Sequence, residues 1–381
     1  MSASTALDQL LAPGDCSPAG AAVGIEPGGR GDGSVRGWAV PPSAGRRVVP
    51  LRRSHLFDLA SVTKAVCTTV ILMKLIATDR VRLDDRAQRF LPELRGDGKD
   101  RITVRHLLTH TAGLQPWFPL YTAATDRAGA LALAAALPLA SRPGDAWRYS
   151  DLGFMLLGRL IERVLGSGLG TAFHTLVAAP LGLHARFGPV PSAQAAASAD
   201  GDGIEYRMIA SGEPYAVPVT PDDFTGWRRD LIRGEAQDGN AAHALGGVSG
   251  HAGLFATIDD LLVLGSALAH GTLVPESTVA EFSQPTSIHP AQALGFRRII
   301  HRDADGPVTV LWHGGYTGTL LAFCPERRTA VAGSALRLLG NRSSALDEPA
   351  PGRPLSGDAI CSILLDNAGL GPGGEREDSR P

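Results

Sequence analysis

Lysine is scarce in this chain of 381 residues. Only three of its 36 basic residues are lysines, at positions 64, 74 and 99, and arginine supplies the rest of the positive charge. The net charge is −2 at pH 7 and no block of like charge stands out, which argues against nucleic acid and anionic membranes as partners. A lysine in a chain that prefers arginine therefore needs a chemical explanation.

Cysteines, long apolar runs and nucleotide motifs are scarce as well. The four cysteines are Cys16, Cys67, Cys324 and Cys361. They are scattered without a CxxC pair, which predicts reduced, mostly buried thiols and no metal site. The longest apolar run, 128–140, is too short for a membrane span and contains Pro138. The glycine clusters contain neither GxGxxG nor GxxxxGK[ST], so we expect no nucleotide and assign no cofactor.

The N-terminal stretch has no Lys or Arg before Arg30 and no continuous apolar segment, so it does not resemble a secretory signal. We therefore expect a cytoplasmic protein. Its predicted partners are small molecules, and nothing in the sequence indicates an oligomeric state.

The order of predicted elements suggests one antiparallel sheet built from both ends of the chain. Short strands are expected within 19–29 and 33–40, and again at 295–300, 308–313, 319–324 and 329–336. Helices are expected at 61–77, 103–110, 152–166, 258–271 and 357–368. The low-complexity stretch 191–203 is predicted to be a mobile loop. The predicted fold class is α+β, with an antiparallel sheet flanked by helices (1–78 and 242–370), an inserted helical domain (79–241) and a disordered tail (371–381).

The stretch DLASVTKAV places Ser61 and Lys64 three residues apart at the start of a helix, where they share one face. Free N–H groups at a helix N-terminus can bind an oxyanion. The positive helix end, together with burial, is expected to push Lys64 toward its neutral form, which could accept the serine proton. Arginine cannot lose its proton in this way. The alternative is a chance Ser-x-x-Lys in which Ser61 only caps the helix.

Two later motifs support catalysis. RYSD supplies Tyr149 and Asp151 immediately before an apolar-periodic helix, although Asp151 could simply cap that helix. LWHGGYTGT places His313, Gly314 and Gly315 at the end of a predicted strand, where two glycines allow a ligand or another backbone to approach closely.

With these motifs in order, the sequence resembles the serine β-lactamase and penicillin-binding-protein superfamily, in its class C-like branch of esterases, D-amino-acid peptidases and acyltransferases. The matching stretches, which span about residues 20–365, are FDLASVTK, LLTHTAGL, RPGDAWRYSDLGFMLLG, GGVSGHAGLFATIDDL and WHGGYTGTLLAFCPER. The resemblance implies that Ser61 is the nucleophile, Lys64 its base partner and Tyr149 a second general base or acid. It also implies an oxyanion hole formed by the backbone N–H groups of Ser61 and Tyr316.

Two departures from the family pattern bear on the substrate. The usual Tyr-x-Asn is Tyr-Ser-Asp here, so Asp151 puts recognition of a β-lactam-type amide in doubt. The usual Lys-Thr-Gly is His313-Gly314-Gly315, and His313 is expected to be a weaker, pH-dependent anion partner than lysine. The predicted substrate-binding residues are therefore Asp151, His313, Gly314 and Gly315, together with Trp117. Both departures favour esters or thioesters over penicillin-like substrates.

Other candidates carry less weight. His106 and His110 are four residues apart, but no Glu lies between them as in HExxH and no third ligand is evident, so we interpret them as structural. His251 is interpreted in the same way. Trp117 could line the acyl or acceptor pocket, or could only cover the helical domain, and the sequence leaves both possibilities open.

The sequence thus predicts a serine acyl-transfer enzyme that works through an acyl-Ser61 intermediate. It would be an esterase or transacylase that moves an acyl group from a small-molecule ester or thioester to water, an amine or an alcohol, in specialised-metabolite biosynthesis. The alternatives are a D-amino-acid peptidase or β-lactamase, and a non-catalytic ligand-binding module on the same scaffold.

Overall fold

A seven-stranded antiparallel sheet forms the centre of the molecule. The computed structural model describes residues 2–13, 17–26, 32–43, 46–339 and 355–371. The strand order is β3-β2-β1-β12-β11-β10-β9, so the N-terminal strands pair with the C-terminal ones, with Ala22 opposite Ser334. The strands are β1 Gly20–Ile25, β2 Asp32–Val40, β3 Val49–Pro50, β9 Arg297–Asp303, β10 Gly306–Gly314, β11 Thr319–Cys324 and β12 Thr329–Ala335. The predicted sheet from both chain ends is confirmed.

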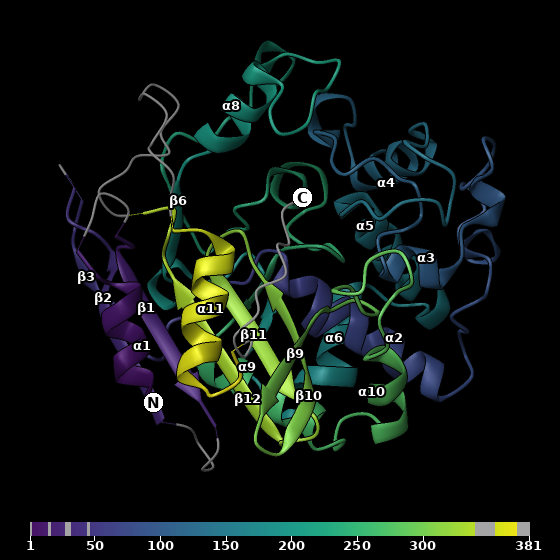
Figure 1. Cartoon of the computed structure of the whole chain (residues 1–381). Coiled ribbons are helices and arrows are strands. Elements are labelled where there is room, and N and C mark those ends of the chain that lie inside the picture. Colours follow the sequence, from purple (N-terminus) through teal and green to yellow (C-terminus); the bar gives the residue numbers. More distant parts are fainter. Residues whose placement is uncertain (1, 14–16, 27–31, 44–45, 340–354, 372–381) are drawn as a thin grey trace.

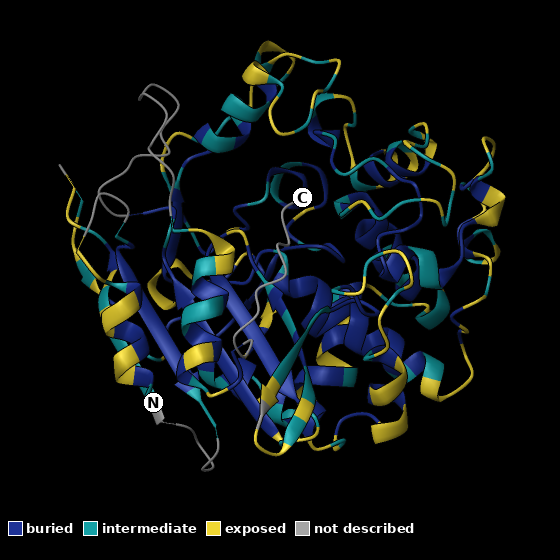
Figure 2. Cartoon of the chain, in the orientation of Figure 1, coloured by how far each residue is buried: buried dark blue, intermediate teal, exposed yellow. Residues whose placement is uncertain are grey.

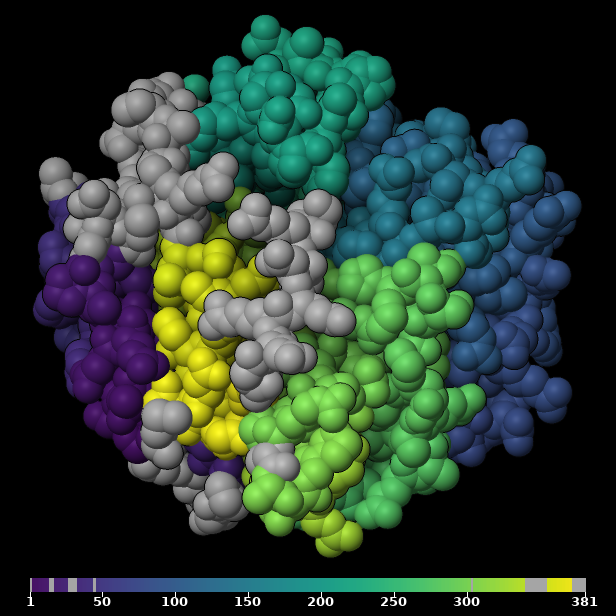
Figure 3. Space-filling model, in the orientation of Figure 1, coloured from purple at the N-terminus to yellow at the C-terminus, as the bar shows by residue number. Residues whose placement is uncertain are grey.

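Helices cover both faces of this sheet (Figure 1). On one face lies α9 (Ile258–Ala269), whose residues Leu261, Leu264 and Leu268 recur at helical spacing and are buried. On the other face lie α1 (Ala3–Leu10) and α11 (Gly357–Asn367), which share a second apolar cluster with β1, β11 and β12. In the space-filling view the purple N-terminal and yellow C-terminal segments lie side by side (Figure 3). The fold class predicted from the sequence is confirmed.

The remaining helices and short strands lie mainly between residues 57 and 282, beside the large sheet. The α-helices there are α2 Val70–Ala77, α3 Val104–Leu108, α4 Arg127–Ala136, α5 Asp151–Leu165, α6 Leu169–Phe173, α7 Ala179–Leu181, α8 Gly203–Ser211 and α10 Glu276–Phe282. A π-helical segment, η1 (Lys64–Thr69), leads into α2. Other single turns are η2 Ala87–Arg89, η3 Lys99–Arg101, η4 Leu120–Thr122, η5 His174–Ala178, η6 Ser192–Gln194, η7 Pro221–Asp223 and η8 Asn240–Ala244.

Two small sheets also form in this part of the chain. One has the order β4-β8-β5, from Phe57–Asp58, Leu254–Ala256 and Arg186–Phe187; the other pairs β6 (Ala197–Asp200) with β7 (Leu231–Arg233). The prediction of a mobile loop at 191–203 is therefore wrong. Ala195, Ala197 and Ala199 are small enough to pack inside, and they are buried in the β6 region. The predicted domain boundaries stay a prediction.

The largest apolar core runs from the sheet into the helices that surround it. Figure 2 shows the buried residues gathered in the central strands and in η1 and α2, with exposed residues on the outer helices. Each residue of η1 is buried, as the apolar character of 61–77 predicts. Cys67, Cys324 and Cys361 are free and buried, as predicted, and Cys16 lies outside the described residues.

Candidate active site

Ser61 and Lys64 are in direct contact. Ser61 follows the short strand β4 and stands just before η1, and Lys64 Nζ donates a hydrogen bond to Ser61 Oγ at 2.7 Å. The Lys64 side chain is 0% exposed, so its amine can reach only the groups packed around it. The predicted i, i+3 pairing on one helix face therefore holds in the structure.

Lys64 also forms an ion pair with Asp151. Its Nζ lies 2.7 Å from Asp151 Oδ1. Burial alone lowers the pKa of Lys64, but the charge of Asp151, with hydrogen bonding to Asp151 and Tyr149, outweighs it and raises the pKa above its ordinary value. The expectation of a neutral Lys64 is therefore wrong for the resting protein. The carboxylate of Asp151 thus favours the charged form of the Lys64 amine.

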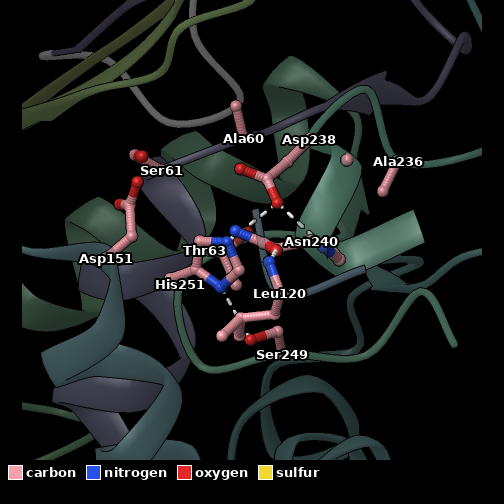
Figure 4. A network of polar contacts seen from close by, with 12 residues as sticks. Ala60, Ser61, Thr63, Leu120, Asp151, Ala236, Asp238, Asn240, Ser249 and His251 are labelled. Carbon is pink, nitrogen blue, oxygen red and sulfur yellow. Dashed lines mark hydrogen bonds and ion pairs between the residues drawn. The ribbon is translucent and has the colours of Figure 1, made fainter. Parts of the chain in front are cut away.

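Asp151 thus lies against Lys64, the partner of the predicted nucleophile. Ser150 is the N-cap of α5, because its Oγ accepts from Gly153 N at 3.2 Å, so the alternative that Asp151 caps the helix is also wrong. Asp151 is the first residue of α5, and its side chain is 19% exposed. In Figure 4 the Ser61 and Asp151 side chains point toward each other. A contact between Asp151 and substrate stays a prediction.

Tyr149 lies against Lys64 and His110. Lys64 Nζ is 5.0 Å from the centroid of the Tyr149 ring, and the His110 ring is 4.4 Å from it, centroid to centroid. His110 Nδ1 accepts from Ser150 N at 3.1 Å. Burial, with the charge of Lys64, holds the pKa of His110 well below 6.5, so its ring is neutral. We interpreted His110 as structural, and the structure adds that it supports the Tyr149 ring.

The two predicted oxyanion donors come from segments that are joined by side-chain hydrogen bonds. Thr317 Oγ1 donates to the Asp58 carbonyl at 2.7 Å, and Thr319 Oγ1 donates to the Leu59 carbonyl at 2.9 Å. A Cβ on Gly315 would lie 2.4 Å from the Leu59 carbonyl oxygen, so only glycine fits there. Within the described part of the chain, the N–H groups of Ser61 and Tyr316 donate to no protein acceptor.

His313 differs from its predicted role. It is buried, and burial together with the charge of Lys64 lowers its pKa to about 3. Its Nδ1 lies 2.9 Å from the Gly314 carbonyl and, in the neutral ring, donates to it. The expectation of a pH-dependent anion partner is therefore wrong, because His313 stays uncharged throughout the physiological range.

Arg297 is a cation beside this site that sequence reasoning missed. It lies on β9 opposite Trp312, the neighbour of His313, and its guanidinium stacks 4.8 Å from the centroid of the Trp147 ring. Its charge acts on His110 and His313. The run GFRRII was identified only as a strand. Its pairing with the strand that carries HGG was the signal that could have singled out this arginine.

Trp117 is largely enclosed. It is 5% exposed and stacks with Tyr215 at 6.5 Å between ring centroids, within an apolar cluster that includes Leu131, Leu152 and Met155. The charge of Asp151 acts on Tyr215, so this aromatic pair borders the site. A contact between Trp117 and substrate stays a prediction.

A row of hydrogen-bonded polar side chains lies next to Lys64. Asp238 Oδ1 lies 2.9 Å from His251 Nε2, and His251 Nδ1 lies 2.7 Å from Ser249 Oγ (Figure 4). The His251 carbonyl accepts from Lys64 Nζ at 3.3 Å. His251, interpreted from sequence as structural, thus helps to fix the amine.

Two further observations concern metal binding and membranes in the parts of the chain that the structure describes. There, no group of three or more His, Cys, Asp or Glu side chains could hold a metal ion. No single helix in the same residues is long and apolar enough to cross a membrane, although α5 and Leu169–Leu181 together meet that test across a bend of 76°.

The chain is similar to a family model, to known proteins in sequence and to solved structures in fold. A family model described as Beta-lactamase matches residues 19–350. The N-acetylmuramyl-L-alanine amidase of Bacillus subtilis (strain 168) is 28% identical over 316 residues, which cover 75% of this chain and 69% of that protein. Among solved structures, EstCE1, a hydrolase with promiscuous acyltransferase activity, has a TM-score of 0.63 at 23% identity, covering 86% of this chain and 90% of that one. The D-amino acid amidase from Ochrobactrum anthropi SV3 has a TM-score of 0.65 at 20% identity, covering 87% and 90%.

Proposed function

The chain belongs to the Beta-lactamase family of serine hydrolases, and we propose that it is an esterase or transacylase that works through an acyl-Ser61 intermediate. Its acyl donor is a small-molecule ester or thioester, and its acceptor is water, an amine or an alcohol. One observation supports this above the others: the buried Lys64 amine contacts both Ser61 Oγ and Asp151 Oδ1 at 2.7 Å. A protein that only binds ligands needs no such arrangement.

The proposed acylation step starts from a charged Lys64. Its ammonium donates to Ser61 Oγ and so stabilises the negative charge that develops there during attack on the donor carbonyl. The Ser61 proton passes to the Tyr149 oxygen while the Tyr149 phenolic proton passes to the leaving group. The N–H groups of Ser61 and Tyr316 hold the tetrahedral oxyanion. In deacylation the relay runs in reverse: the proton of the attacking acceptor passes to the Tyr149 oxygen while the Tyr149 phenolic proton passes to Ser61 Oγ.

This proton route is more compatible with the Lys64–Asp151 ion pair than a neutral lysine base is. With Asp151 beside it, Lys64 would have to lose a proton before it could take one from Ser61. The relay through Tyr149 leaves the Lys64–Asp151 pair intact. The similarity to EstCE1, whose description names both hydrolysis and acyl transfer, is compatible with either acceptor.

The test is covalent labelling. Wild-type protein is incubated with a fluorophosphonate or a p-nitrophenyl ester, and the intact mass is measured. We expect an adduct that is lost in Ser61→Ala and unchanged in Ser54→Ala, a matched serine before β4. The absence of any adduct in wild type across several acyl donors would favour a ligand-binding module instead. Product partition with amines and alcohols present then separates transacylation from hydrolysis.

A second candidate function, a D-amino-acid amidase or peptidase, is favoured by Arg297. The sequence argument against anionic substrates relied on the missing lysine of Lys-Thr-Gly, but Arg297 places a cation on the neighbouring strand. Of the similar proteins named above, the D-amino acid amidase fits this alternative by its name. If it holds, Arg297→Gln raises KM for a D-alanyl-D-alanine peptide at least tenfold more than KM for a neutral ester. A cephalosporin in the same assay tests β-lactamase activity.

A further inference from the structure

One buried carboxylate holds the turn that carries the nucleophile. Ala60, directly before Ser61, has a φ of 43°, in the left-handed region that costs a residue with a Cβ about 1 kcal/mol. Its N–H donates to Asp58 Oδ1 at 2.9 Å, and Asp58 is buried. A hydrogen bond to a charged acceptor is strong enough to offset that strain. Because Ala60 sets the direction of the following peptide, this contact also orients the Ser61 N–H.

The same residue reaches the second oxyanion donor. The Asp58 carbonyl accepts the hydrogen bond from Thr317 Oγ1 at 2.7 Å, and Thr317 directly follows Tyr316. One residue thus contacts both segments that would supply oxyanion N–H groups.

A third contact connects Asp58 to the hydrogen-bonded side chains that lie next to Lys64. Asp58 Oδ2 accepts from Gln237 N at 2.7 Å, and the next residue is Asp238, which pairs with His251. Figure 4 shows the carboxylate of Asp238 pointing toward the His251 ring. Asp58 therefore links the nucleophile turn, the β10–β11 turn and the segment that fixes Lys64.

We propose that Asp58 is a positioning residue that sets the geometry of the oxyanion hole, by holding Ala60 in its left-handed conformation and anchoring Thr317. This inference rests on the proposed function of Ser61 as nucleophile. Asp58 itself touches no reacting atom.

A pH dependence follows. Burial raises the pKa of Asp58 to about 6, although the hydrogen bonds from Ala60 and Gln237 lower it. Of the charged groups nearby, Asp238 raises this pKa and Arg228 lowers it. Below about pH 6 the protonated carboxyl can no longer accept both N–H groups, so acyl transfer slows. Because the folded pKa exceeds the ordinary 3.8, the stability that this group contributes is present below about pH 4 and lost as pH rises through 6. Activity and stability therefore change in opposite directions.

The experiment compares Asp58→Asn, Thr317→Val and Thr317→Ser, with Thr329→Val as a matched control, since Thr329 donates to a backbone carbonyl elsewhere on the sheet. Asparagine keeps the shape of Asp58 but presents an N–H to one of the two N–H donors. We expect Asp58→Asn to lower kcat about 100-fold, the scale of one lost oxyanion donor, with KM within threefold. A boronic acid that forms a tetrahedral adduct should lose affinity by a similar factor. Thr317→Val should lose about tenfold, Thr317→Ser should recover most of that, and Thr329→Val should stay near wild type.

Three results would overturn the inference. These are Asp58→Asn with kcat within threefold of wild type, a loss confined to KM with unchanged boronic-acid affinity, or a wild-type profile of kcat against pH without a limb near pH 6. If Asp58→Asn does not fold, the Thr317 series and the wild-type profile decide. A wild type that forms no Ser61 adduct instead contradicts the proposed function. Hydrogen exchange at Ala60 then tests Asp58, because it should accelerate at least tenfold in Asp58→Asn, which weakens the acceptor of the Ala60 N–H, and not in Thr329→Val.

Discussion

Lys64 occupies a space that fits no other basic side chain. Its Nζ lies 2.7 Å from both Ser61 Oγ and Asp151 Oδ1 and 3.3 Å from the His251 carbonyl, with no exposed surface. An arginine would keep the charge, but its planar guanidinium is larger and directs its donors differently. The presence of a lysine and not an arginine at position 64 is thus explained by shape, rather than by the ability to lose a proton.

We expect Lys64→Arg to be nearly as inactive as Lys64→Ala, because the guanidinium cannot make these contacts within the same buried volume. The rate of fluorophosphonate labelling measures this, with Lys74→Arg as the control, since Lys74 is not fully buried in α2. Substantial labelling of Lys64→Arg would show that charge alone suffices.

Asp151→Asn tests the ion pair separately. Without the carboxylate, burial lowers the pKa of Lys64, so the ammonium is lost at high pH. We expect kcat/KM of the variant to fall between pH 8 and 10, where wild-type activity persists because Asp151 keeps the pKa of Lys64 above its ordinary value. Profiles of kcat/KM against pH for both proteins provide the measurement. A variant with the wild-type profile but a raised KM would instead support the predicted substrate contact of Asp151.

At the scale of elements, the loop before β8 sets the distance between the two helices that meet at the site. Thr68 Oγ1 in η1 donates to the Gly250 carbonyl at 2.7 Å. On the other side, a Cβ on Gly250 would lie 2.1 Å from the Phe154 carbonyl oxygen and 2.9 Å from Gly158 in α5. The loop is therefore packed between the helix of Lys64 and the helix of Asp151.

Gly250→Ala is expected to push these helices apart. The overlap is with backbone atoms, which cannot move aside cheaply, so we expect a destabilisation of about 2 kcal/mol and a loss of activity. Gly168→Ala is the matched control, because its φ is −63° and a Cβ there meets nothing within 4 Å. Thermal unfolding and labelling rates measure both effects. Equal behaviour of the two variants would contradict the proposed spacing.

The elements with strong periodicity could be predicted from the sequence, and others could not. The helix at 152–166 and the strand at 319–324 appear as α5 and β11, since their apolar spacing matches the burial that each element experiences. The strand β6 was missed because its alanines provide almost no hydrophobic pattern. Its burial depends on pairing with β7, more than thirty residues away.

At the scale of the molecule, the sequence singled out candidate residues that lie in contact in the structure, but not the charge states of Lys64 and His313. Ser61, Lys64 and Tyr149 are recognisable from local motifs. The charge on Lys64 depends on Asp151, and the neutrality of His313 depends on its enclosure, and both are properties of contacts between distant segments. The position of Arg297 beside the site likewise required the β9–β10 register.

The last prediction concerns the stability of the whole molecule against pH. Glu205 accepts from Gly239 N at 2.6 Å and from the Tyr121 hydroxyl at 2.8 Å. Burial, with the charge of Asp238, raises its pKa from 4.5 to about 8. The folded state therefore binds the Glu205 proton more tightly than the unfolded state does, and the stability from this group is present below about pH 4.5 and lost as pH rises through 8.

The effect of Glu205 on stability can be measured in a pH range in which the buried histidines do not titrate. The buried histidines His110 and His313 have lowered pKa values, so they cost stability only as pH falls below 6.5. Between pH 6.5 and 8.5 we expect the free energy of unfolding of wild type to decline, and the decline to flatten in Glu205→Gln, which keeps an acceptor for Gly239 N. Denaturant unfolding at several pH values measures this. Parallel slopes in the two proteins would show that Glu205 does not titrate there, and that the stability of the fold near neutral pH is governed by other groups.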